Sequence, residues 1–70
     1  MKSVALVEKK LKEEMAKRDR AIRILTSQIE HERWLLAEKK LRDVIDLEKS
    51  ISYTEEILIH LKTREKDLQK

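Results

Sequence analysis

Apolar residues in the first half of the chain recur at spacings of three, four or seven positions. The residues that follow this spacing are Val4, Val7, Leu11, Met15, Ile22, Leu25, Ile29 and Leu36. On a helix that turns about 100° per residue, they form a stripe about 80° wide. No strict alternation of apolar and polar residues competes with it, so the pattern predicts an amphipathic helix from about residue 3 to residue 29 or beyond. Only Arg18 interrupts the stripe, and we expect its guanidinium to extend toward solvent rather than to set a register from inside the core.

A second apolar stripe runs along the rest of the chain and predicts another helical segment from about residue 34 to residue 69. Its members are Trp34, Ala37, Leu41, Val44, Ile51, Leu58 and Leu61. The start of this stripe is rotated by roughly 100° from the first. The apolar face of the chain therefore changes direction between residues 29 and 34. Trp34 is therefore either a core residue at a bend or an exposed anchor for a partner.

Two segments could hold a turn, and the sequence does not choose between them. One is 30–33, where Ser27 and Glu30 match a capping box. The other is 50–54, where Ser52 and Glu55 match the same motif and poorer helix formers gather. A continuous helix whose seam changes register is the remaining alternative. We therefore predict one all-α domain over residues 1–70, either an antiparallel helical hairpin or a long coiled coil, and favour the hairpin.

Both architectures leave apolar surface in water, because two helices enclose little volume. We therefore predict self-association into a dimer or a four-helix-type bundle, or packing on a helix of another protein. The residues predicted to form the oligomer or partner interface are Val4, Val7, Leu11, Met15, Ile22, Leu25, Ile29, Trp34, Leu41, Val44, Ile51, Leu58 and Leu61.

The composition excludes several kinds of functional site. The 70 residues contain no Gly, Pro or Cys, which rules out phosphate-binding glycine loops, disulfides and thiolate metal sites. Neither His31 nor His60 belongs to the Glu-x-x-His pattern of metal-binding bundles. We therefore predict no catalytic residues, no metal ligands and no cofactor.

The charges are nearly balanced, with 17 basic and 14 acidic side chains, and residues 1–35 hold the whole excess. Acids four residues before bases, such as Glu14 with Arg18 and Glu38 with Arg42, are expected to pair along the helices. One face of the first helix carries bases that could contact the phosphates of a nucleic acid. These residues are Lys9, Lys12, Arg20 and Arg23.

The sequence thus favours a non-enzymatic helical interaction module, meaning an adaptor, an inhibitor or an oligomerisation element. The alternative is a small dimeric regulator that binds nucleic acid through the basic face within residues 9–23. Only four apolar residues follow Ser3 before Glu8, which is too few for a secretory signal, and no stretch approaches the length of a membrane span. We therefore expect a cytoplasmic protein.

Overall fold

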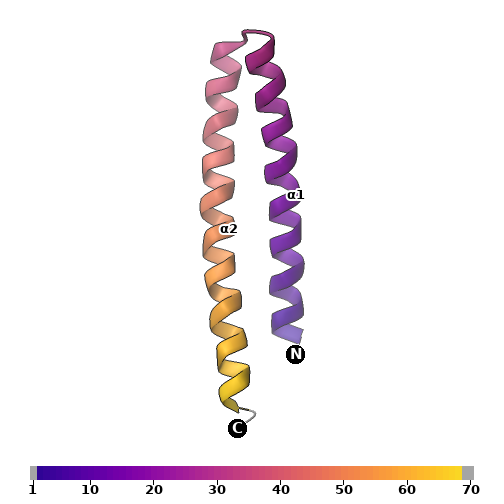
Figure 1. The fold of residues 1–70 in the computed structure, drawn as a ribbon, viewed down its shortest axis with the longest axis vertical. Helices are drawn as coiled ribbons and strands as arrows, with labels where there is room; N and C mark the ends of the chain where they lie inside the picture. The colour runs from indigo at the N-terminus through magenta and orange to yellow at the C-terminus, as the bar shows by residue number, and fades with distance from the viewer. Residues whose placement is uncertain (1, 69–70) are drawn as a thin grey trace.

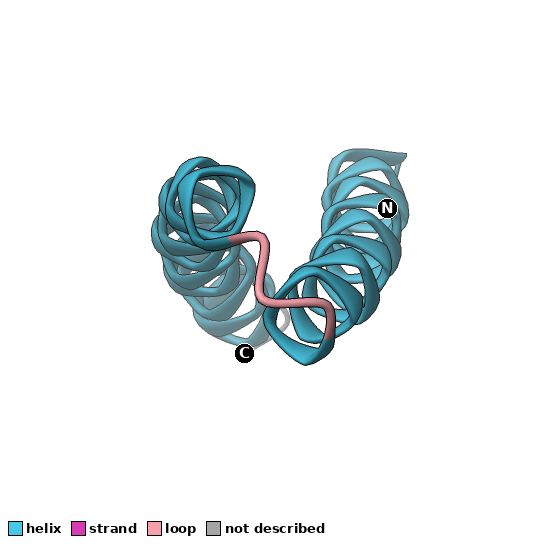
Figure 2. Cartoon of the chain, turned by 90° about the horizontal axis from the view of Figure 1, so that it is seen from above, coloured by secondary structure: helices cyan, strands magenta, loops and turns pink. Residues whose placement is uncertain are grey.

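The chain forms a hairpin of two antiparallel helices (Figure 1). The computed structural model describes residues 2–68, in which α1 spans Lys2–Glu30 and α2 spans Trp34–Leu68. The helices lie side by side in a rod of 57 × 14 × 12 Å, and the view along the rod shows one short loop crossing between them (Figure 2). The predicted helical hairpin is confirmed. Residue 69, where the second helix was expected to end, lies outside the described residues.

The turn occupies residues 31–33 and is built without glycine. The Glu32 N–H donates to the Ile29 carbonyl at 3.0 Å, and the Arg33 N–H donates to the Gln28 carbonyl at 2.8 Å. This pair of hydrogen bonds is a Schellman motif, which requires a left-handed residue at its second-last position, the first residue beyond the helix cap. Glu32 supplies that residue with a φ of 56°. The motif satisfies carbonyls at the end of α1 and turns the chain back within three residues.

The His31 side chain adds to this helix end. Its Nδ1 lies 2.7 Å from the Ser27 carbonyl oxygen, to which the His31 backbone N–H also donates at 3.1 Å. Ser27 therefore lies inside the last turns of α1 and does not begin a helix. The capping-box interpretation of Ser27 and Glu30 was wrong, although the turn does lie in the segment that it marked.

Helix α2 runs without interruption through 50–54, so the second predicted turn was wrong. The reason is burial: Ile51 is 3% exposed and Thr54 is 1% exposed, and both face α1. The Thr54 hydroxyl lies between the Glu14 carboxylate of α1, at 2.7 Å, and the Ser50 carbonyl oxygen of the preceding turn, at 2.9 Å, so its oxygen does not cap the start of a new helix.

The two helices meet along one continuous seam. In α1 it consists of Val4, Val7, Leu11, Glu14, Arg18, Ala21, Leu25 and Gln28. In α2 it consists of Ala37, Lys40, Val44, Leu47, Ile51, Thr54, Leu58 and Leu61. These positions are buried or half-buried, and their spacing alternates between three and four residues, as in a heptad repeat.

The seam departs from the predicted apolar stripe halfway along α1. After Leu11 it takes Glu14 rather than Met15, and then Ala21 rather than Ile22. A straight helix repeats every 3.6 residues, whereas a contact line between two long helices repeats every 3.5, so the two patterns drift apart by about 20° per heptad. Leu36 was wrongly placed on the first stripe, because the chain turns before reaching it.

Candidate interaction surface

The structure divides the predicted interface residues into two groups. Buried or half-buried at the seam or its edge are Val4, Val7, Leu11, Met15, Leu25, Val44, Ile51, Leu58 and Leu61. Exposed on the surface are Ile22, Ile29, Trp34 and Leu41. The first group, apart from the half-buried Met15 at the edge of the seam, is thus used by the hairpin itself, and the second remains open to a partner.

The exposed group lies on one side of the hairpin, together with Met15. Met15, Ile22 and Ile29 are seven residues apart and share one face of α1, and Trp34 and Leu41 share the matching face of α2. Side chains of both helices surround a shallow hollow of about 280 Å³ lined by Leu25, Ile29, Trp34, Ala37, Glu38 and Leu41. We call the set Met15, Ile22, Ile29, Trp34 and Leu41 the apolar flank.

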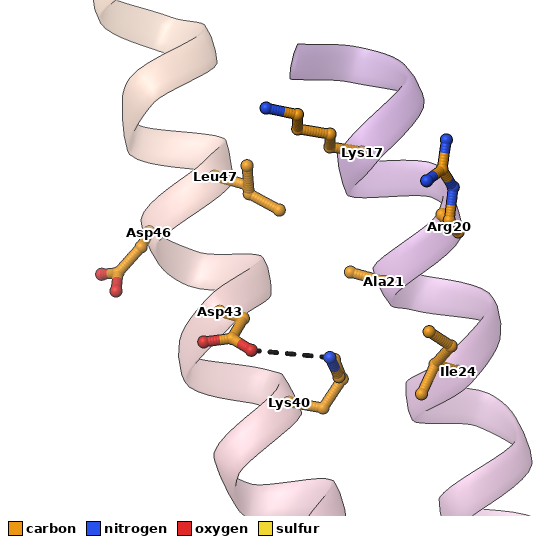
Figure 3. Close-up of a pocket in the computed structure, with 8 residues that line it drawn as sticks. All are labelled: Lys17, Arg20, Ala21, Ile24, Lys40, Asp43, Asp46 and Leu47. Atoms are coloured by element: carbon orange, nitrogen blue, oxygen red, sulfur yellow. Dashed lines mark ion pairs between the residues drawn. The ribbon is translucent and has the colours of Figure 1, made fainter. Parts of the chain in front are cut away.

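The opposite side of the hairpin carries charge. An open groove of about 420 Å³ there is lined by Lys17, Arg20, Ala21, Ile24, Lys40, Asp43, Asp46 and Leu47 (Figure 3). Lys17 extends from α1 toward α2, and Lys40 pairs with Asp43 at 3.6 Å. Acids and bases offset one another in this groove, so it resembles a solvated helix edge rather than a binding site for one charged ligand.

A polar cluster crosses the seam between the middle of α1 and the middle of α2. The Glu14 carboxylate is 8% exposed and accepts hydrogen bonds from the Ser50 hydroxyl and from the Thr54 hydroxyl, the latter at 2.7 Å. These hydrogen bonds, first that from Ser50 and then that from Thr54, lower the pKa of Glu14 below its ordinary value of 4.5. The positive charges of Lys10 and Lys17 act in the same direction, and burial opposes them.

This cluster was not predicted from the sequence, because Glu14 was expected to pair with Arg18 and Thr54 lay in a possible turn. The available signal was the spacing of Val7, Leu11 and Glu14, which continues the heptad into a carboxylate. Arg18 instead bonds Asp19 at 3.2 Å at the edge of the seam, which agrees with the expected outward orientation. The expected pair of Glu38 and Arg42 forms at 3.8 Å.

The predicted nucleic-acid residues lie together on the outer surface of α1. Lys9, Lys12, Arg20 and Arg23 are all exposed. Exposed acids, including Asp19, lie among them, and the helix surface is convex. The arrangement can contact phosphates along one side of a backbone, but it offers no aromatic side chain for stacking on bases.

Other kinds of site find no support in residues 2–68. Among the side chains that the structure describes, no three from His, Asp or Glu come close enough together to hold a metal ion. Over the residues that the structure describes, neither helix has a stretch long and apolar enough to cross a membrane. A scan against models of protein families, a search of curated proteins and a search of solved structures each find no match to this chain.

Proposed function

We propose that this chain is a non-enzymatic interaction module that packs helices of a partner against the apolar flank. The observation that carries the proposal is the exposure of large apolar side chains around one hollow: Trp34 is 63% exposed and Leu41 is 46% exposed. An adaptor, an inhibitor and an oligomerisation element would all act through such a surface.

The physical basis is the cost of leaving this surface in water. Burying apolar area contributes roughly 25 cal/mol per Å², and contiguous exposed apolar patches on small proteins commonly mark interfaces. A tryptophan beside aliphatic residues is a typical interface anchor. The partner supplies apolar helical side chains, and the assembly is a dimer or a four-helix-type bundle with coiled-coil-like packing. The proposed setting is the cytoplasm, which stays a prediction from the sequence.

The test compares two variants that place the same charges on different surfaces. The chain is immobilised and exposed to extract from its native host, and captured proteins, including copies of the chain itself, are identified by mass spectrometry. We expect Trp34→Glu with Leu41→Glu to lose the proteins captured by the wild type. The control, Tyr53→Glu with Ile59→Glu, alters residues that are 66% and 65% exposed but lie off the apolar flank, and it should retain them. Equal capture by both variants, or no specific capture by the wild type, contradicts the proposal.

A second candidate function is supported by the exposed basic residues of α1, which the hairpin does not use. Reversing the charges of Lys9, Lys12, Arg20 and Arg23 should abolish binding to DNA or RNA measured at low salt and reduce its salt dependence. The matched control reverses the charges of Lys39, Arg42, Lys49 and Lys62, which are exposed bases of α2. This second function is excluded if the wild type shows no affinity at low salt, or if the two variants lose affinity equally.

A further inference from the structure

We infer that the partner of the apolar flank is a second copy of this chain, bound face to face with both turns at the same end of the dimer. This inference rests on the proposed function and names its partner. The two copies would be related by a twofold axis parallel to the helices, and the product would be a four-helix bundle.

The apolar residues are distributed over the two helices as in a helix bundle. A helix that packs on one neighbour needs the two seam positions of each heptad, whereas a helix in a bundle needs a third apolar position beside them. In α1 this third position holds Met15, Ile22 and Ile29, and in α2 it holds Trp34 and Leu41. Both helices widen their apolar surface toward the same side, which makes a flat face two helices wide. A second hairpin has a face of the same width and the same chemistry.

The apolar flank lies off-centre along the rod, next to the turn. From Met15 to Ile29 it covers about 21 Å at 1.5 Å per residue, and it ends at the turn of a rod 57 Å long. Beyond Met15 the same helical positions hold Glu8 in α1 and both Glu48 and Glu55 in α2.

This off-centre position disfavours full overlap of two rods with their turns at opposite ends. If two rods overlapped fully with their turns at opposite ends, each apolar flank would cover the glutamates of the other copy, and burying unpaired carboxylates costs several kcal/mol. With both turns at the same end, flank lies on flank along its whole length. The glutamates then remain at the open end in solvent.

The two helices carry opposite net charges. In sequence, α1 holds eight basic and five acidic residues, a net charge of +3, and α2 holds seven basic and eight acidic residues, a net charge of −1. An axis parallel to the helices places α1 of one copy beside α2 of the other, so opposite net charges face each other across the interface. The orientation with turns at opposite ends places α1 beside α1 and sets like charges against each other.

The oligomeric state gives the first test. Sedimentation should show a concentration-dependent dimer for the wild type. Leu41→Glu should weaken dimerisation at least about tenfold, because it introduces a charge at the centre of the interface. Trp34→Glu is a second variant that removes an anchor at the first position of α2, where a glutamate suits the helix dipole and leaves the hairpin folded. Tyr53→Glu is the control and should remain dimeric.

Orientation gives the second test, and the chain has no cysteine that would interfere. A spin label on Arg33→Cys should report a distance between copies of about 20 Å or less, which is two helix diameters. Turns at opposite ends, with flanks overlapping, would separate the labels by about 30 Å or more. The longer distance overturns the orientation. A folded monomer at all concentrations overturns the second copy as partner, and the proposed function survives that result if the flank variant still loses captured proteins that the control retains.

Discussion

The half of the hairpin next to the turn and the half at the open end use their apolar residues differently. In the open half the seam is mainly aliphatic, with Val4, Val7, Leu11, Ile51, Leu58 and Leu61 on either side of the polar pair Glu14 and Thr54. In the turn half the seam is small or polar and contains Arg18, Ala21, Gln28, Ala37 and Lys40, with Leu25, Val44 and Leu47 as its larger aliphatic members. Other large apolar side chains of the turn half lie outside the seam, and Ile22, Ile29, Trp34 and Leu41 among them gather on the apolar flank. The open half thus buries aliphatic side chains in its own seam, although it also exposes Leu6, Tyr53 and Ile59. The turn half gathers exposed apolar side chains from both helices on one surface that another molecule can cover.

The largest expected effect on stability comes from truncating a buried seam residue, compared with truncating an exposed residue of the apolar flank. Ile51→Ala removes a side chain that is 3% exposed in the seam, and it should lower the free energy of unfolding by about 2–4 kcal/mol at every protein concentration. Leu41→Ala removes a side chain that is 46% exposed, so its effect on the hairpin alone should stay below about 1 kcal/mol. Leu41→Ala should lower the free energy of unfolding further only at concentrations where the partner copy is bound. Urea unfolding followed by circular dichroism over a range of concentrations measures both effects.

If Ile51→Ala does not fold, the milder change Ile51→Val replaces it in this comparison. It should lower the free energy of unfolding by about 0.5–1.5 kcal/mol. Equal losses for Ile51→Ala and Leu41→Ala in the dilute limit would show that the two halves are not packed differently.

The next largest effect concerns the polar cluster of Glu14, Ser50 and Thr54, which lies in the open half near the middle of the rod. Glu14→Ala should lower the free energy of unfolding by about 1.5–3 kcal/mol, because it removes a charged acceptor of buried hydroxyl groups. A double-mutant cycle with Thr54→Val should give a coupling energy of about 1–2 kcal/mol. The combined change Glu14→Leu with Thr54→Val makes the seam aliphatic through this layer and should match or exceed the stability of the wild type. A coupling energy of zero would mean that the hydrogen bond across the seam contributes no stability.

The same cluster makes the open half sensitive to acid. Because the pKa of Glu14 is lower in the folded chain than its ordinary value of 4.5, the ionised carboxylate stabilises the fold above that pH. This contribution is lost as the pH falls below 4.5 and through the lowered pKa of the folded state. We expect the wild type to lose stability in that window more steeply than Glu14→Gln. Glu13→Gln, which changes an exposed neighbour on the outer face of α1, should follow the wild type. Parallel acid profiles for the wild type and Glu14→Gln would contradict the assignment.

How far the sequence predicted the structure depends on the same two halves. Where the seam is aliphatic, as at Val7 and Leu11, the periodicity identified the contact residues. Where the seam takes small or polar residues, the apolar pattern led to the neighbours Ile22 and Ile29, which turned out to be exposed. Burial of Glu14 could not be read from an apolar pattern, because it depends on hydroxyl groups that arrive from a helix about 40 residues later.

The turn was predicted in its place but not in its mechanism. The sequence offered no residue that strongly breaks a helix, and the capping motif at Ser27 was not used. What closes α1 is a pair of backbone hydrogen bonds and a left-handed glutamate, and no local preference of that glutamate indicates it. The geometry becomes favourable only once the two seams are in contact. The turn half therefore depends on packing for its shape as well as for its exposed surface.

The smallest expected effect tests that dependence at Glu32. A non-glycine residue with a φ of 56° carries a backbone cost that glycine does not, so Glu32→Gly should raise the free energy of unfolding by about 0.5–1 kcal/mol. The control is Glu30→Gly, which places glycine two residues earlier in the last turn of α1 and should lower stability by up to about 1 kcal/mol. Thermal unfolding of the two variants beside the wild type measures the opposite signs. If both variants lower the free energy of unfolding, the left-handed conformation of Glu32 does not carry the backbone strain that we assign to it. Opposite signs would instead show that packing of the seams holds Glu32 in a strained conformation, at a position where glycine fits better.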